Sequence, residues 1–86
     1  DLIVRIINPF VQQEMGLRLD AKGVVIVEPG PNGSRLGFRA GDIIEEINGV
    51  TIISAEQIDE LVGSSSRSGQ FIISRDGQRL IIRYRT

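Results

Sequence analysis

The stretch GFRAGDIIEEINGV, from Gly37 to Val50, decides how this chain folds. Gly41 before Asp42 predicts a tight turn, because glycine adopts backbone conformations that other residues resist. The letters IIEEI predict a strand whose two faces are both mixed, which suits a strand near the edge of a sheet. Asn48-Gly49 is the strongest short signal for a β-hairpin. The stretch therefore predicts a turn, a strand and a second turn.

The acidic residues of the same stretch allow a second interpretation, a pair of catalytic carboxylates. Such a pair requires two acids that converge across a cleft. Glu45 and Glu46 are expected to point to opposite faces of a strand, so they should not converge. Asp42 is expected to accept hydrogen bonds from the amides of its turn. A small enzyme that uses Asp42 is therefore kept only as a contrasting hypothesis.

Length and composition exclude several classes of function. The 86 residues suffice for one domain, residues 1–86, and Asp1 as first residue suggests a domain excised from a larger protein. A net charge of −1 gives no reason to expect binding to nucleic acid. The absence of cysteine and histidine removes disulfides, the commonest general base and the commonest metal ligand. We expect no catalytic residue, no metal, no cofactor and no direct insertion into a membrane.

The first third of the chain predicts two strands and a helix. The β-branched run LIVRII, Leu2 to Ile7, favours a strand, and GVVIVEP, Gly23 to Pro29, favours another. Between them, Asn8 suits a helix N-cap and Pro9 the first helical position, so PFVQQEMG predicts a short helix that ends at Gly16.

The second half predicts a helix followed by a hairpin. In SAEQIDELVG, Ser54 and Gln57 resemble a capping box, and Ile58 and Leu61 are expected to pack in the core. A polar loop at Ser64–Ser66 should follow, and without histidine none of its serines has a general base. The last 17 residues predict a hairpin that turns at Asp76-Gly77.

The glycine-rich segment GPNGSRLG, from Gly30 to Gly37, lacks the spacing of a phosphate-binding loop. Within it, Ser34 to Leu36 are expected to form one helical turn.

The predicted fold class is α+β: a small, partly open β-barrel or sandwich of five to six strands capped by two helices. A sheet with an exposed edge strand beside an apolar helix could accept a peptide as an added strand.

The order of these motifs resembles a PDZ domain. Pro29-Gly30, Gly41-Asp42, Ile44, Ile47 and Asn48-Gly49 occupy the places of that family's central pattern, and SAEQIDELV resembles its groove-lining helix. The chain departs from the family at Pro31-Asn32-Gly33, where Ser-Pro-Ala is usual, which predicts a looser turn.

The segment NPFVQQEMGLRLDAKGVVIV resembles the bacterial form found in HtrA/Deg-type serine proteases of the cell envelope. The resemblance implies a peptide-binding module that recognises C-terminal or exposed apolar segments and regulates a trypsin-like protease domain elsewhere in the parent protein. It implies a location in the bacterial periplasm or envelope, and it allows an oligomeric parent. The alternative is an adaptor or scaffold module of a secretion or other envelope complex, or of an aspartyl-protease-type protein.

The resemblance also suggests where a peptide would bind. In the preferred placement the peptide runs antiparallel to the first strand, opposite the helix. The residues expected in contact are Leu2, Ile3, Val4, Arg5, Ala55, Asp59 and Val62. Backbone amides near Leu2 would hold the terminal carboxylate, although most of the family's carboxylate-binding loop would precede Leu2.

A rival placement puts the carboxylate-binding loop later in the chain. It takes Met15-Gly16-Leu17-Arg18-Leu19 as the loop, and the docking strand would then begin within it. The residues of this alternative loop are Gly16, Leu17, Arg18 and Leu19. The spacing to Gly23 favours the first placement.

Overall fold

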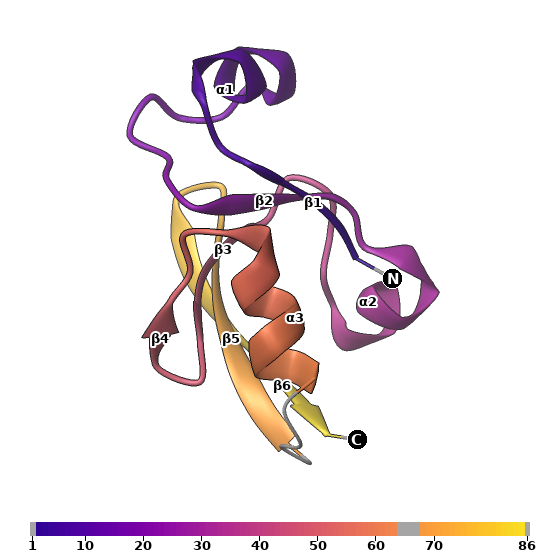
Figure 1. Ribbon diagram of the computed structural model, residues 1–86. Helices are drawn as coiled ribbons and strands as arrows, with labels where there is room; N and C mark the ends of the chain where they lie inside the picture. Colours follow the sequence, from indigo (N-terminus) through magenta and orange to yellow (C-terminus); the bar gives the residue numbers. More distant parts are fainter. Residues whose placement is uncertain (1, 64–67, 86) are drawn as a thin grey trace.

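The computed structural model describes residues 2–63 and 68–85 of the chain, so the predicted loop at Ser64–Ser66 lies outside the described residues. The elements are, in order, β1 (Ile3–Ile6), α1 (Pro9–Met15), β2 (Val24–Glu28), α2 (Gly30–Leu36), β3 (Ile43–Ile47), β4 (Val50–Thr51), α3 (Ala55–Gly63), β5 (Ser68–Arg75) and β6 (Gln78–Arg85). Figure 1 shows the strands curving around α3, with α1 set apart at one end of the molecule. The predicted α+β class is confirmed.

The six strands form one open antiparallel sheet rather than a closed barrel. Their order is β1-β2-β3-β5-β6, and the short β4 pairs with β3. The prediction that Ile43–Ile47 lies near an edge is wrong, because β3 pairs with both β2 and β5. A central strand can carry two glutamates here because both find a partner on β6, as described below.

Both hairpin turns lie where the sequence predicted them. Asn48 and Gly49 have φ of +50° and +83°, and Asp76 and Gly77 have φ of +52° and +81°. Positive φ at both central residues matches the turn type that follows the twist of antiparallel strands. The second turn starts the β5–β6 ladder, whose first pair joins Arg75 to Gln78.

The caps of α1 are those expected. The Asn8 side chain accepts a hydrogen bond from the Val11 amide at 2.8 Å, Pro9 begins the helix, and Gly16 follows it in the left-handed conformation. These contacts satisfy amide and carbonyl groups that a helix leaves unpaired at its ends.

The helix α2 differs from its prediction. A single, looser turn was expected at Ser34–Leu36, yet the helix begins at Gly30 and includes Pro31. Proline is favourable there, because the first turn of a helix does not use its missing N–H group. Gly37, at φ +104°, ends the helix in the left-handed conformation.

The core lies between the sheet and α3. The side chains of Val24, Ile26, Ile44, Ile47 and Ile73 are fully buried within it. Three aromatic rings extend this core toward the end of β6. Phe38 packs edge-on against Phe71 with their ring centroids 4.9 Å apart, and Phe71 packs edge-on against Tyr84 with their ring centroids 5.5 Å apart. From α3, Ile58 is buried in the same cluster and Leu61 packs against it, as the sequence predicted.

Candidate functional site

A groove lies between β1 and α3, which contact each other. It encloses a cleft of about 640 Å³. Five of the residues predicted to contact a peptide line this cleft: Leu2, Val4, Ala55, Asp59 and Val62. The first two come from the start of the chain and the other three from α3, so the fold brings together the two segments named from the sequence.

The remaining two predicted residues of the first strand, Ile3 and Arg5, do not line the groove. They alternate with Leu2 and Val4, and successive side chains of a strand point to opposite faces. Ile3 is half exposed, and Arg5 forms an ion pair with Glu14 of α1 at 2.7 Å. Ile3 and Arg5 can therefore contribute to this groove only through their main chain.

The groove has an apolar floor that is also the core of the domain. Phe38, Ile58, Phe71 and Tyr84 are buried, belong to the core cluster and line the cleft. An apolar floor favours apolar ligand side chains, because burying them removes their surface from water. These four residues were not named as site residues from the sequence.

The N-terminus of α3 is capped by the side chain of Gln57, in the first turn of the helix. The Gln57 Oε1 accepts hydrogen bonds from the amides of Ile53 at 2.6 Å and Ser54 at 3.0 Å. The Gln57 amide group donates to the Thr51 carbonyl at 3.1 Å. The glutamine half of the predicted capping box is thus confirmed, and it fixes the helix that carries one wall of the groove.

The other wall is β1, the terminal strand of the sheet. A terminal strand has main-chain N–H and C=O groups directed away from the sheet, so it can accept a further strand. The start of β1 is positioned against α2: a Cβ atom at Gly33 would lie only 2.9 Å from Leu2 Cδ2. Glycine at this position therefore lets the Leu2 side chain lie against the helix.

The rival loop lies elsewhere. Gly16, Leu17 and Arg18 border a separate cleft of about 520 Å³, beside the turn at Asp42 and the β5–β6 hairpin. Leu19 is 92% exposed. None of the four residues lines the groove between β1 and α3, so the two placements correspond to different surfaces.

The buried carboxylate of Asp42 is held by three hydrogen bonds. Its side chain is 1% exposed, and its Oδ1 and Oδ2 accept from Arg75 Nε and Nη2 at 2.8 and 2.7 Å. Oδ2 also accepts from the Arg39 amide at 2.9 Å, the turn bond that the sequence predicted. The hydrogen bond to Asp42 raises the pKa of Arg75. Both oxygens are thus engaged in joining the turn to β5.

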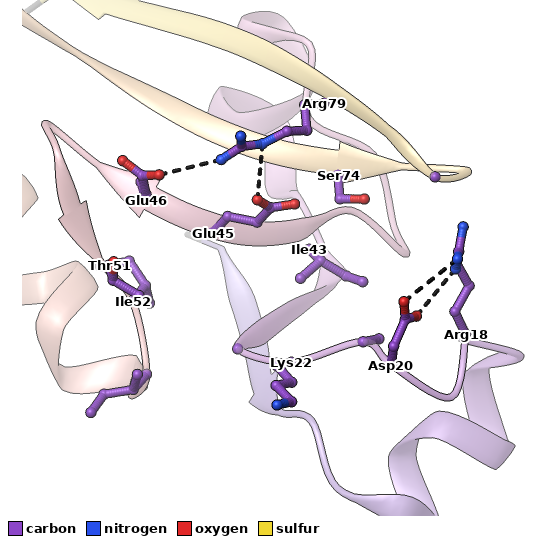
Figure 2. A pocket seen from close by; sticks show the side chains of 14 residues that line it. Arg18, Asp20, Lys22, Ile43, Glu45, Glu46, Thr51, Ile52, Ser74 and Arg79 are labelled. Carbon is purple, nitrogen blue, oxygen red and sulfur yellow. Dashed lines mark hydrogen bonds and ion pairs between the residues drawn. The ribbon is translucent and has the colours of Figure 1, made fainter.

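The prediction that Glu45 and Glu46 cannot converge is wrong. A register shift between Ile44 and Glu46 interrupts the regular pairing of β3 with β5. Figure 2 shows both glutamates reaching the same arginine: Arg79 contacts Glu45 at 3.2 Å and Glu46 at 3.3 Å. A β-bulge of this kind changes the side on which the next side chain emerges.

This convergence does not create a hydrolytic pair. An arginine lies between the two carboxylates, in the place that a substrate would have to occupy. Among the described residues, no cluster of acidic, histidine or cysteine side chains could hold a metal ion. In the same part of the chain, no helix is long and apolar enough to cross a membrane.

Comparison with known proteins agrees with this fold. The HtrA-type protease AlgW with decapeptide matches with a TM-score of 0.84 and 18% identity, over 98% of this chain and 27% of that chain. The HtrA3 PDZ domain bound to a phage-derived ligand, FGRWV, matches with a TM-score of 0.79 and 23% identity, over 98% of this chain and 79% of that chain. No curated protein gives a significant sequence match.

These likenesses, at low identity, establish the fold, and the chain spans only about a quarter of AlgW. The family is established by the sequence itself. The sequence model described as "PDZ domain" matches residues 23–73, which include β2, α2, β3 and α3. The match covers more than half of the chain, so this chain belongs to the PDZ domain family.

Proposed function

We propose that this domain binds C-terminal or extended peptide segments by adding them as a strand to β1. The observation that carries the proposal is the groove itself. It has a terminal strand on one side, a helix on the other and an apolar floor between them. Main-chain hydrogen bonds to β1 would supply affinity, and side-chain pockets would supply selectivity.

The groove suggests how a peptide would be oriented. Leu2 and Val62 would shape the pocket for the last side chain of the ligand. Amides near Leu2 would hold the terminal carboxylate, because unpaired N–H groups attract anions. Asp59 is exposed on the helix wall and would favour a basic or hydroxyl side chain two positions from the peptide end.

For the parent protein we propose an envelope serine protease of HtrA/Deg type, in which this domain recognises substrates or regulates activity. Two observations support it: the N-terminal sequence pattern, and the likeness in fold to an HtrA-type protease over nearly the whole chain. The bacterial periplasm or envelope is the corresponding location.

A peptide titration followed by amide NMR shifts tests the binding function. The ligand is a short peptide with a free, apolar C-terminus, and the control is the same peptide with an amidated end. We expect shifts at residues 2–7 and 55–62 that weaken strongly with the amide.

Other outcomes would redirect the proposal. Shifts confined to residues 16–19 would move the site to the rival loop. Equal shifts with acid and amide would mean that internal extended segments bind without a free chain end. An absence of shifts in a folded domain would contradict peptide binding and would favour the adaptor hypothesis, which a partner pull-down in excess free peptide examines.

A further inference from the structure

Two arginines that line the groove have no acidic partner among the described residues. Arg35 of α2 and Arg85 of β6 both line the cleft. Four other arginines form ion pairs: Arg5, Arg18, Arg75 and Arg79. Within residues 2–63 and 68–85, Arg35 and Arg85 have no acidic partner. A cationic group left unpaired in a ligand groove is available to a ligand.

These arginines belong to two elements that contact each other, α2 and β6. Leu2 packs against Gly33 of α2, two residues before Arg35 in the same helix. The helix α2 in turn contacts β6, which ends at Arg85. Figure 1 shows the N-terminal end of β1 directly beside α2. The groove therefore has one positive charge on the helix that Leu2 lies against and another on the strand that contacts this helix.

The opposite charge of the groove comes from a different element. Among the described residues, Asp59 of α3 is the acidic residue that lines the cleft, and it lies about one helical turn before Val62. A peptide lying along β1 would thus meet two cationic groups and one anionic group from separate walls. A ligand with the complementary arrangement gains from each contact, whereas like charges placed opposite each other are unfavourable.

We propose that the groove selects peptides that carry an acidic side chain in one of their last two residues, and that Arg35 and Arg85 are the residues that determine this selectivity. The inference rests on the proposed docking of a peptide along β1. It assigns the two guanidinium groups to a side-chain carboxylate of the ligand, in addition to any terminal carboxylate held by amides.

The test compares peptides that differ by one group. Two fluorescent peptides share an apolar sequence and carry either Glu or Gln next to the last residue, and a second pair carries them at the last residue. Affinities are measured by fluorescence anisotropy for the wild-type domain, for R35Q, for R85Q and for the double variant. R83Q serves as the matched control, because Arg83 is exposed on the same strand and does not line the groove.

We expect at least one Glu peptide to bind about two- to fivefold more tightly than its Gln counterpart, the range typical of exposed charge pairs. R83Q should keep this ratio, each groove variant should lower it, and the double variant should bring it close to one. The ratio should also fall as salt rises, because exposed charges are screened. All variants replace exposed side chains, and circular dichroism verifies their folding.

The outcomes separate this inference from the proposed function. Equal binding of Glu and Gln peptides by the wild type would overturn the acidic preference and leave peptide binding intact. An unchanged ratio in the double variant would overturn the role of the two arginines. If the double variant keeps the Glu-to-Gln ratio but, with the free and amidated peptides of the NMR titration, loses its preference for the free acid, the arginines serve the terminal carboxylate and the side-chain assignment is wrong. If no peptide binds, both proposals fail.

Discussion

At the scale of single residues, Asp42 connects parts of the chain that are distant in sequence. It follows the turn at Gly41, lies directly before β3 and accepts hydrogen bonds from Arg75 of β5, 33 residues away. Arg75 donates as well to the Gly37 carbonyl at 2.8 Å, just beyond α2. Because the pKa of Arg75 is raised, its ion pair with Asp42 contributes fully to the stability of the fold at neutral pH. This contribution is lost only when the pH rises through the raised pKa of Arg75.

Replacing Asp42 with asparagine should destabilise the domain by about 2–4 kcal/mol, because the buried hydrogen-bond network loses its negative charge and one of its two acceptor oxygens. Urea unfolding followed by circular dichroism measures this loss. Asp20→Asn is the control, since Asp20 pairs with Arg18 at the surface and its loss should cost less than about 1 kcal/mol. Equal losses in the two variants would mean that the Asp42 network contributes little.

At the scale of elements, α3 depends on a cap that lies outside the groove. Gln57 uses both the oxygen and the nitrogen of its side-chain amide to join the start of the helix to Thr51 of β4 and to the residues that follow it. The groove-lining residues Ala55, Asp59 and Val62 are carried by the same helix. The position of the groove wall is therefore coupled to contacts that no ligand would touch.

Gln57→Ala should lower stability by about 1 kcal/mol, the usual value of a helix cap, and should weaken peptide binding modestly. Hydrogen exchange of the α3 amides should be faster in the variant, and peptide affinity is measured by anisotropy. Glu60→Ala is the control on the same helix, because Glu60 is exposed and lies outside the cap. Faster exchange in both variants would argue against a specific role of the cap.

The elements also show what the sequence could predict. Caps and hairpin turns depend on neighbouring residues, so Asn8, Asn48-Gly49 and Asp76-Gly77 were placed correctly. The convergence of Glu45 and Glu46 depends on Arg79, which lies more than 30 residues later, and on a bulge with no local sequence signal. The central place of β3 is likewise a property of the whole sheet.

At the scale of the whole molecule, burial is uneven across the sheet. The buried residues of β2, β3 and β5 form the centre of the core, whereas Ile3, Arg5 and Ile6 of β1 are exposed. The two walls of the groove were identified from the sequence through the resemblance. Arg35 and Arg85 were not, because their elements come together only in the folded chain.

Amide hydrogen exchange should accordingly be slowest in β2, β3 and β5 and faster in β1 and β4. At a peptide concentration one hundred times Kd, binding should add about 2.7 kcal/mol to the free energy of unfolding. The β1 amides should gain the most protection, because strand addition gives them new partners. Protection that increases uniformly, without an excess in β1, would contradict docking at this strand.

The sharing of the groove floor with the core has an evolutionary consequence. A mutation of Phe71 or Tyr84 that reshapes the pocket also removes packing from the interior, so selection for stability should restrain it. Arg35, Asp59 and Arg85 are exposed and carry no such constraint. Divergence of ligand preference among descendants of this domain should therefore begin at its charged rim, while the aromatic floor is inherited nearly unchanged.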